Sequence, residues 1–367
     1  MTTAPTEITV SLGERSYPIL IGEGTLDALP ALLTRMGVSG IVAILTDSNV
    51  EPLLGGRVAA LVRDAGLREV TCVMPAGEEF KRISRVEEFT GMMLEAGLDR
   101  SSTVIALGGG VVGDVAGYTA ASFMRGIRCI QIPTTIVAQV DSSVGGKTGV
   151  NHPMGKNTIG AFHQPEAVLI DMALLRTLPP RELRAGLAEV IKHGIIADSA
   201  LFEHMERSVD SILAMDMEAL EMPIRRSCEI KAAIVAADER EGGVRANLNY
   251  GHTFGHGIEA VTEYKRFLHG EAIALGMVCA GALGRELGLV DDAFCERQRA
   301  CMEAYGLPVV WPEVPVDAVL EAMTHDKKVR AGTLKFIVAN GMGSVVHRTD
   351  VTADQARRAV EALRSEG

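Results

Sequence analysis

Hydrophobic residues in the first half of the chain follow two alternating patterns. Short apolar runs rich in β-branched residues lie at positions 41–45, 70–74, 103–107, 127–132 and 167–170, whereas apolar residues recur with a helical period at 53–65 and 86–96. Short buried strands separated by helices are typical of βαβ units and predict a mostly parallel sheet. The opening segments ITVSL and YPILIG predict two extra, antiparallel strands.

The pattern changes after the sequence Thr-Leu-Pro-Pro at 177–180. Helical periodicity then dominates, at 181–196, 200–210, 222–237, 252–264 and 271–287. Proline fits the first turn of a helix, so the double proline marks a boundary. We therefore predict an α/β domain of the nucleotide-binding type over residues 1–178 and an all-α domain over residues 179–367.

Charge and composition narrow the class of protein. The chain has 36 Lys and Arg against 47 Asp and Glu, a net charge of −11, which argues against nucleic acid or an anionic membrane as a partner. The apolar stretch at 272–284 is shorter than the roughly 20 residues that span a bilayer, and the first residues do not resemble a signal peptide. The cysteines form no CxxC pair, as expected of reduced thiols in a cytoplasmic protein.

A glycine-rich turn follows the predicted strand at 103–107. Gly109, Gly110 and Gly113 precede Asp114, and glycines between a strand and a helix let a ligand approach the backbone. The free N–H groups of the helix would attract a pyrophosphate. The spacing is not GxGxxG, and a tight strand-to-helix turn explains the same residues.

Acidic residues follow two other predicted strands. Asp47 could accept a hydrogen bond from a ribose hydroxyl or could cap a helix. Glu78 and Lys81 form a polar pair that is either part of a site or a solvated ion pair.

Residues 133–165 read as one long, polar, glycine-rich loop. Loops of this length are usually functional, although an ordinary surface loop is the alternative. The segment GGKT resembles the end of a Walker A loop, but Asp141 stands where the first glycine is required, which excludes a P-loop. The glycines still fit an anion-binding turn to which lysines supply charge.

A metal centre is the third candidate site. Glu189 and Lys192 share one face of a helix with apolar neighbours, and a buried carboxylate needs a partner or a metal. His252 and His256 have i, i+4 spacing, and His269 opens another helix. One Glu with two or three His suits zinc with an open coordination position. Core histidines that bind no metal are the alternative, and spacing alone does not say which histidines bind.

These segments together resemble the 3-dehydroquinate synthase family. The resemblance covers about residues 40–345 and rests on GGGVVGDVAGYTAASFMRG, IPTTIVAQVDSSVGGKTGVNHPMGKNTIGAFHQP, LAEVIKHG, LNYGHTFGHGIE and HGEAIALGM. Glycerol dehydrogenases and other sugar-phosphate cyclases belong to the same superfamily. Gly257 stands where the family usually has alanine, at a cost to the helix of about 1 kcal/mol.

The resemblance implies an activity. The enzyme would convert 3-deoxy-D-arabino-heptulosonate 7-phosphate to 3-dehydroquinate and phosphate, the second step of the shikimate pathway. The implied chemistry is oxidation of a ring hydroxyl, elimination of phosphate, reduction, ring opening and aldol closure, and NAD is regenerated in each turnover. The active site would lie in the cleft between an NAD-binding domain and a metal- and substrate-binding domain.

The resemblance also assigns residues. Zinc, or else cobalt, would be held by Glu189, His252 and His269. The substrate would be held by a second set, in which the last member comes from the partner subunit of a homodimer: Asp141, Lys147, Asn157, Lys192, Lys231, Arg245, Asn249, His256 and Arg125. NAD would be bound by a third set: Asp47, Glu78, Lys81, Gly109, Gly110, Gly113, Asp114, Thr134, Thr135, Lys147, Lys156, Leu174, Leu175, Arg176 and Thr177. A further candidate for the substrate is Lys327 or Lys328.

Two other functions remain open from the sequence. A metal-dependent polyol dehydrogenase of the same fold would accumulate NADH, whereas the cyclase returns its hydride within the turnover. A non-catalytic nucleotide-binding or scaffold protein would keep its metal content when Glu189 is replaced.

Overall fold

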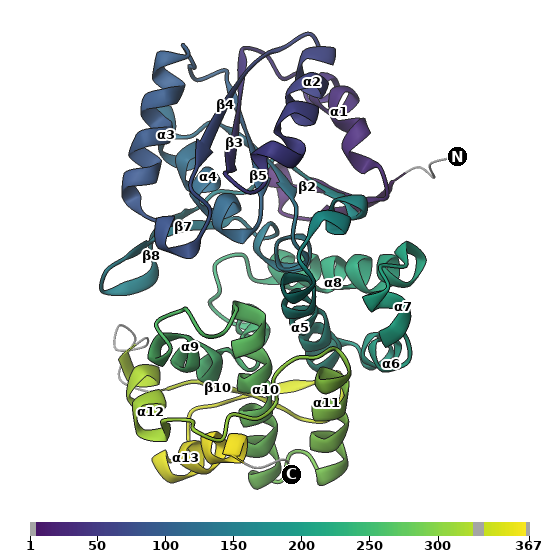
Figure 1. Cartoon of the computed structure of the whole chain (residues 1–367), viewed down its shortest axis with the longest axis vertical. Coiled ribbons are helices and arrows are strands. Elements are labelled where there is room, and N and C mark those ends of the chain that lie inside the picture. The colour runs from purple at the N-terminus through teal and green to yellow at the C-terminus, as the bar shows by residue number, and fades with distance from the viewer. Residues whose placement is uncertain (1–4, 326–333, 365–367) are drawn as a thin grey trace. The chain divides into compact units, whose positions relative to one another are not determined.

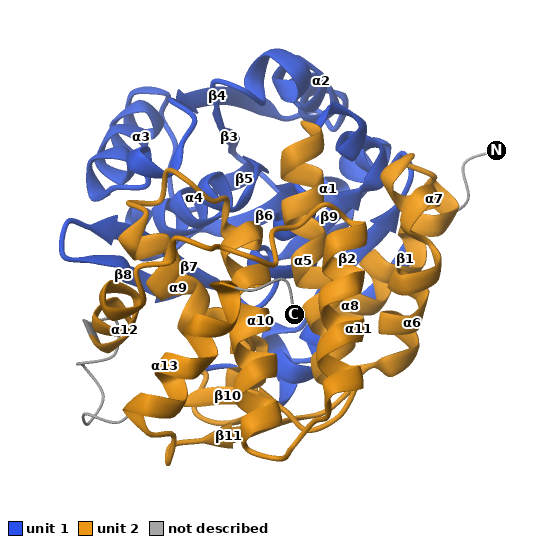
Figure 2. Ribbon diagram, turned by 60° about the horizontal axis from the view of Figure 1, so that its bottom comes forward, with its two compact units in different colours: residues 1–178, 231–240 blue, residues 179–230, 241–367 orange. Residues whose placement is uncertain are grey.

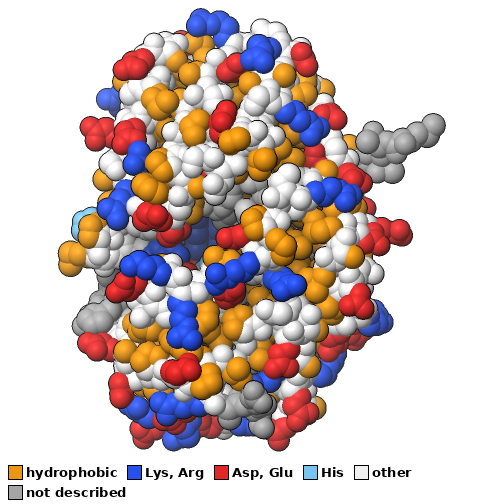
Figure 3. Space-filling view, in the orientation of Figure 1, with side chains coloured by type: hydrophobic (Ala, Val, Ile, Leu, Met, Phe, Trp, Pro, Cys, Tyr) orange, Lys and Arg blue, Asp and Glu red, His pale blue; other side chains and the backbone are white. Residues whose placement is uncertain are grey.

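The computed structural model describes residues 5–325 and 334–364. They divide into two compact units, one formed by Met1–Leu178 with Lys231–Arg240 and the other by Pro179–Ile230 with Glu241–Gly367 (Figure 2). Within the described residues, no helix is long and apolar enough to cross a membrane. On the face shown in Figure 3, basic and acidic side chains are interspersed.

A seven-stranded sheet forms the centre of the first unit. In spatial order its strands are β1 (Thr6–Val10), β2 (Tyr17–Gly22), β9 (Ala167–Asp171), β6 (Arg128–Pro133), β5 (Thr103–Gly108), β3 (Ile41–Asp47) and β4 (Arg68–Met74). The β1–β2 pair is antiparallel and the other neighbours are parallel. The chain passes from β3 to β4 in one direction and then to β5 on the other side of β3. Ligands of such sheets bind at this change of direction, beyond the carboxyl ends of the strands.

Helices cover both faces of this sheet, as the continuous apolar runs predict. Along β3, Val42 and Ile44 pack into one hydrophobic cluster, whereas Ala43 and Leu45 pack into the other. Figure 1 shows the helices on either side of the sheet. They are α1 (Leu29–Arg35) and α2 (Gly56–Asp64) on one face, and α3 (Ile83–Glu95) and α4 (Gly110–Ser122) on the other.

The segment predicted as a long loop contains an ordered hairpin. Strands β7 (Lys147–His152) and β8 (Gly155–Phe162) pair antiparallel and form a separate two-stranded sheet. Two glycines make the close pairing possible, since a Cβ on Gly160 would lie 2.1 Å from the Thr148 carbonyl oxygen and one on Gly149 would lie 2.6 Å from that of Ile159.

The second unit is helical with one small hairpin. Its helices are α5 (Pro180–Ala197), α6 (Ser199–Arg207), α7 (Val209–Leu213), the first part of α8 (Met217–Ala237), α9 (His252–Val261), α10 (His269–Glu286), α11 (Asp292–Ala304), α12 (Val316–His325) and α13 (Ala353–Glu361). The hairpin pairs β10 (Phe336–Ala339) with β11 (Val345–Arg348). A Cβ on Gly257 of α9 would lie 2.8 Å from Cγ of Met323 in α12, so close helix packing uses the glycine.

The predicted fold class is confirmed. A mostly parallel sheet with helices on both faces is followed by a helical region, to which the structure adds the β10–β11 hairpin. The assignment of NAD to residues 1–178 and of metal and substrate to residues 179–367 stays a prediction.

Candidate functional site

Three residues of the second unit could hold one metal ion. Glu189 comes from the middle of α5, and His252 and His269 are the first residues of α9 and α10. One ligand atom from each lies within 4.8 Å of the others. The Glu189 Oε1 atom is 3.7 Å from Nε2 of His252 and 3.6 Å from Nε2 of His269. Residues far apart in the sequence thus meet at one carboxylate oxygen.

Hydrogen bonds on the other ring nitrogens orient both histidines. Nδ1 of His252 lies 3.1 Å from the Tyr250 carbonyl oxygen, and Nδ1 of His269 lies 3.2 Å from Oε1 of Glu259. An imidazole that donates from Nδ1 keeps the lone pair of Nε2 for a metal. Both lone pairs therefore face Glu189.

Tyr250 is itself anchored from another helix. Its buried hydroxyl donates to Oε1 of Gln298 in α11, at 2.5 Å, and Nε2 of Gln298 donates to the Met277 carbonyl oxygen at 2.8 Å. Gly251, which follows Tyr250, has a φ of 78°. A Cβ there would lie 3.0 Å from the Met277 backbone nitrogen, so only glycine fits this turn before His252.

The donor set fits a divalent cation. Glu189 is fully buried; its Oε2 accepts a hydrogen bond from Lys192, but its Oε1 has no hydrogen-bond partner among the described residues. A buried carboxylate oxygen without a hydrogen bond destabilises the folded state unless a positive charge, such as a cation, compensates it. Burial, together with the positive charge of Lys192, lowers the pKa of His252 well below its ordinary value. The neutral ring is the form that binds metals.

A second group of possible ligands shares His269. His256, Glu259 and His269 also offer ligand atoms close enough for one ion. In this arrangement Glu259 faces the Nδ1 side of the His269 ring, opposite the Nε2 side that faces Glu189. A neutral imidazole has one nitrogen with a free lone pair, so His269 can serve only one of the two groups at a time. In the structure, Nδ1 of His269 lies within hydrogen-bond distance of Glu259, which leaves Nε2 for the group that contains Glu189.

Of the other predicted substrate residues of the second unit, His256 lies near this group. The His256 ring centroid is 5.4 Å from that of His252 and 6.2 Å from that of His269. Arg245 is buried, and the Asn249 amide donates to Oε1 of Glu241 at 3.0 Å. Both lie in the turn Val244–Asn249, just before α9. Lys327 and Lys328 lie outside the described residues.

In the first unit, Lys81 joins two predicted residues from different elements. Its buried ammonium forms an ion pair with Asp114 of α4 and donates to Oδ1 of Asn157 in β8 at 2.6 Å. Burial raises the pKa of Asp114, and Lys81 opposes that rise. Asn157 has a φ of 55°, a left-handed conformation that asparagine tolerates better than most residues.

Asn151 of β7 was not assigned a role from the sequence, but it completes this network. Its amide donates to Oε1 of Glu78 at 2.8 Å, its Oδ1 accepts from the Asn157 backbone N–H at 2.9 Å, and its own N–H donates to the Lys81 carbonyl oxygen at 2.8 Å. Lys156 Nζ lies 3.8 Å from the same Glu78 oxygen. Glu78 and Lys81 are therefore held by the hairpin and are not a solvated pair.

A second ion pair of this unit joins residues predicted to hold the substrate. Lys231 is buried, and its ammonium donates to Oδ1 of Asp141 at 2.6 Å and to the Asp141 backbone carbonyl. Asp141 belongs to the short turn Ala138–Ser142, and Lys231 belongs to the part of α8 that groups with the first unit. No spacing in the sequence indicates this pair.

The predicted glycine-rich turn lies between β5 and α4. Cβ atoms on Gly109, Gly110 and Gly113 would lie 3.0–3.1 Å from side-chain atoms of Thr135, Ser142 and Gln131, respectively. Close packing therefore explains why these positions are glycine. The backbone N–H of Thr134 donates to the Gly108 carbonyl oxygen, which joins the ends of β6 and β5.

Residues at the ends of two other strands also have structural partners. Oδ1 of Asp47 accepts from the backbone N–H groups of Asn49 and Val50, so this oxygen acts as a cap. After β9, the side chains of Leu174 and Leu175 are buried, Arg176 pairs with Glu23, and the Thr177 hydroxyl donates to the Leu174 carbonyl oxygen.

Lys147 and Arg125 are exposed at the surface of the first unit. Lys147 is the first residue of β7. Arg125 has a φ of 70° and follows Met124, which has a φ of 50°. Two consecutive left-handed residues other than glycine make a strained turn.

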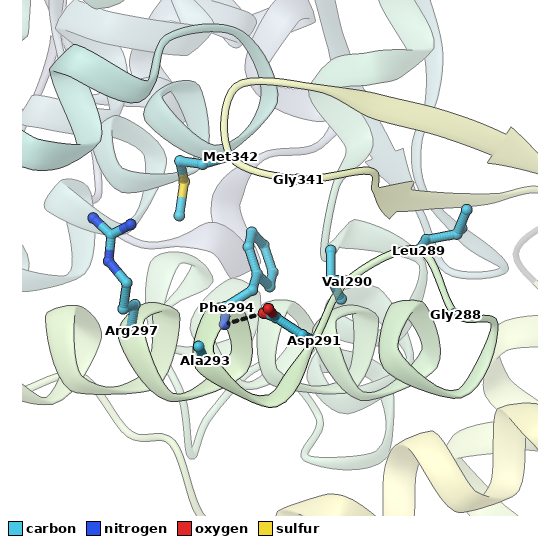
Figure 4. Close-up of a pocket in the computed structure, with 9 residues that line it drawn as sticks. All are labelled: Gly288, Leu289, Val290, Asp291, Ala293, Phe294, Arg297, Gly341 and Met342. Atoms are coloured by element: carbon cyan, nitrogen blue, oxygen red, sulfur yellow. Dashed lines mark hydrogen bonds between the residues drawn. The ribbon is translucent and has the colours of Figure 1, made fainter.

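Figure 4 shows a hollow on the second unit. It is lined by Gly288, Leu289, Val290, Asp291, Ala293, Phe294, Arg297, Gly341 and Met342. Within the described residues, this lining contains no member of the predicted site. Arg297 is also bound to Glu206, and Oδ1 of Asp291 accepts from the Phe294 N–H as a helix cap.

Comparisons with known proteins identify the family of this chain. The model of the 3-dehydroquinate synthase N-terminal domain matches residues 71–185, and that of the C-terminal domain matches residues 186–329. The chain belongs to the 3-dehydroquinate synthase family. A 3-dehydroquinate synthase from Acidithiobacillus ferrooxidans is 49% identical over 98% of both chains, and one from Citrifermentans bemidjiense is 50% identical over 92% of this chain and 93% of the relative. The resemblance seen in the sequence motifs is confirmed.

Solved structures of other cyclases share the fold. A 2-epi-5-epi-valiolone synthase from Streptomyces hygroscopicus with NAD+ and Zn2+ bound is 30% identical, with a TM-score of 0.88 over 96% of this chain and 98% of that one. A 2-deoxy-scyllo-inosose synthase complexed with carbaglucose-6-phosphate, NAD+ and Co2+ is 26% identical, with a TM-score of 0.87 over 98% and 99% of the two chains. A probable glycerol dehydrogenase from Sinorhizobium meliloti, 20% identical with a TM-score of 0.62, shows the fold alone.

Proposed function

We propose that this chain is a 3-dehydroquinate synthase of the cytoplasm, active as a homodimer. It converts 3-deoxy-D-arabino-heptulosonate 7-phosphate to 3-dehydroquinate and phosphate and thereby serves the shikimate pathway. The observation that carries the proposal is 49% identity over 98% of both chains to a 3-dehydroquinate synthase. The donor set at Glu189 supports the proposal, because the reaction begins with oxidation of a hydroxyl and a divalent cation held by these donors would lower the pKa of that hydroxyl.

The metal of the proposed enzyme is Zn2+, or Co2+ in its place. Glu189, His252 and His269 would hold it. When bound, a divalent cation lowers the pKa of a coordinated hydroxyl and orients it. Lys192 holds the Glu189 side chain in place through its hydrogen bond to Oε2.

The dinucleotide of the proposed enzyme is NAD, which accepts a hydride early in the turnover and returns it later. Most of its residues follow β3, β4, β5, β6 and β9, so they share the edge formed by the carboxyl ends of these strands, whereas Lys147 and Lys156 belong to the β7–β8 hairpin. Asp47 would accept from a ribose hydroxyl. Glu78, Lys81 and Asp114 would line the nicotinamide side, where the hairpin holds them rigidly.

Substrate contacts supply positioning and charge more than proton transfer. The phosphate would be held by Lys147, Asn157, Arg245, Asn249 and His256, and by Arg125 of a second copy of the chain. The carboxylate and hydroxyls would be held by Asp141, Lys192 and Lys231. Oxidation acidifies the neighbouring C–H bond, and the phosphate of the substrate can then take that proton as it leaves. Groups already fixed by ion pairs favour such a reaction because little ordering remains to be done.

Phosphate release tests the proposal. We expect the purified protein to release inorganic phosphate from the heptulosonate phosphate, to require NAD, and to lose activity with a chelator. Absorbance of NADH should show no net change. Steady NADH accumulation with glycerol, without phosphate release from the heptulosonate phosphate, would instead identify a polyol dehydrogenase.

A further inference from the structure

The two histidines of the metal group are oriented by different kinds of partner. His252 donates from Nδ1 to a backbone carbonyl, whereas Nδ1 of His269 faces the carboxylate of Glu259 at 3.2 Å. The Glu259 side chain is 4% exposed and lies on α9, one element before the helix that His269 opens. Among the described residues, the partner of His252 Nδ1 is thus a backbone oxygen, whereas the partner of His269 Nδ1 is a nearly buried carboxylate.

We propose that Glu259 is the positioning residue of the metal site, which accepts a hydrogen bond from Nδ1–H of His269 and thereby fixes Nε2 as the metal-binding atom. The proposal rests on the metal site proposed above. The two nitrogens of an imidazole point to opposite sides of the ring, so a bond that holds Nδ1 sets the direction of Nε2. In the structure that direction leads to Glu189 Oε1, 3.6 Å away.

The position of His269 explains why it needs such a partner. Its side chain is 31% exposed, against 12% for His252, so packing restrains its ring less. A hydrogen bond to a charged acceptor supplies the missing restraint.

The charges around the site point to the same role. Lys192 is 1% exposed and bonded to Glu189, so its positive charge offsets the charge of the ligand carboxylate. A divalent cation with two neutral histidines and this ion pair would leave two uncompensated positive charges in a buried site. Glu259 supplies a negative charge beside a ligand without occupying a coordination position. Carboxylates that hold metal-bound histidines in this way make the ring a stronger ligand.

The test measures Zn2+ affinity of the purified full-length protein by competition with a chromophoric chelator. We expect Glu259→Gln to weaken Zn2+ binding by about 10- to 100-fold. Glu259→Asp keeps the charge but has a shorter side chain, so its Zn2+ affinity should lie between those of the wild type and Glu259→Gln. Glu263→Gln is the matched control, because that carboxylate is 76% exposed in the connection that follows α9. It should bind Zn2+ as the wild type does.

The visible spectrum of the Co2+-loaded protein separates positioning from coordination. With Glu259 as a positioning residue, Glu259→Gln should keep the band pattern of the wild type once saturated, whereas His269→Ala should change it. A Glu259→Gln protein with wild-type Zn2+ affinity would overturn the proposal. A spectrum like that of His269→Ala would overturn it as well, because Glu259 would then be a ligand. Should Glu259→Gln fail to fold, Glu259→Asp is measured in its place. Wild-type Zn2+ affinity of Glu259→Asp, together with a wild-type Co2+ spectrum at all metal concentrations, then counts against the proposal.

The result also distinguishes this inference from the proposed function. A wild-type protein that binds neither Zn2+ nor Co2+ refutes the metal site itself. A wild-type protein that binds Zn2+ and releases phosphate, with a Glu259→Gln variant of equal affinity, refutes the positioning role alone.

Discussion

Replacing Lys192 in its buried pair with Glu189 should have opposite effects on two quantities. It should lower the free energy of unfolding and raise the affinity for the metal. Their side chains are 0% and 1% exposed, so Lys192→Met leaves a carboxylate charge buried without its partner. Removing one member of such a pair costs about 3–5 kcal/mol. We expect the metal-free variant to lose that much of its free energy of unfolding.

A bound cation changes this result. It would lie beside the other oxygen of Glu189 and compensate the charge that Lys192 no longer offsets, so the loss should be smaller in the zinc-loaded protein. The same difference must appear as tighter metal binding, because the coupling is reciprocal. If the bound cation restores about 1.4 kcal/mol or more of the free energy of unfolding that the substitution removes, Lys192→Met should bind Zn2+ at least about tenfold more tightly than the wild type. Phosphate release should nevertheless fall, because Lys192 is proposed to hold the substrate.

Urea unfolding of the metal-free and zinc-saturated proteins, together with Zn2+ competition, measures both sides of the cycle. Lys265→Met is the control, since that lysine is 78% exposed and its ion pair with Glu263 should contribute less than about 1 kcal/mol. Equal destabilisation in both states would refute the reasoning, as would weaker Zn2+ binding by Lys192→Met.

Three further outcomes are expected. Lys147→Ala should slow phosphate release at least about tenfold, since a charge-assisted contact contributes about 1.5–3 kcal/mol. Because the pKa of His252 is lowered in the folded protein, the unfolded chain takes up a proton first, and the free energy of unfolding of the metal-free protein should fall as the pH drops below about 6.5. Gly117→Ala in α4 places a Cβ 2.4 Å from Cγ2 of the buried Thr148 and should destabilise by about 1–3 kcal/mol in thermal or urea unfolding.

Each of these outcomes has its own control. An unchanged rate for Lys147→Ala removes that lysine from the phosphate site. His252→Asn cannot take up the proton, so it should flatten the pH profile, and an equally steep profile in that variant contradicts the assignment. Gly91→Ala in α3 meets nothing within 4 Å and should stabilise by up to about 1 kcal/mol; a similar gain for Gly117→Ala would show that Thr148 yields without cost.

Strands buried on both faces could be predicted from the sequence, whereas the polar hairpin could not. The run at 103–107 is apolar throughout because both faces of β5 are covered, and the structure has β5 there. In β8, by contrast, exposed and half-buried residues follow one another without a buried apolar face, so period-2 patterning gave no signal. Its pairing depends on glycines whose importance appears only when β7 lies opposite.

The sequence identified the ligand types of the metal group but not the choice among histidines. Spacing alone left the choice among His252, His256 and His269 open, and the family resemblance assigned His252 and His269 to the metal. The structure supplies the physical reason in the Nδ1 partners, Tyr250 and Glu259. Neither they nor Asn151 could be found by spacing rules, because each acts through a contact that a turn or a hairpin creates.

The hydrogen bond between Tyr250 and Gln298 links the proposed metal site to α11. The tyrosine is held by its hydroxyl at one end and orients His252 through its carbonyl at the other. A genetic screen for growth that depends on added zinc should therefore recover changes at Gln298 as well as at the three ligands. Such alleles would lie in a helix that supplies none of them, and extra metal should rescue them.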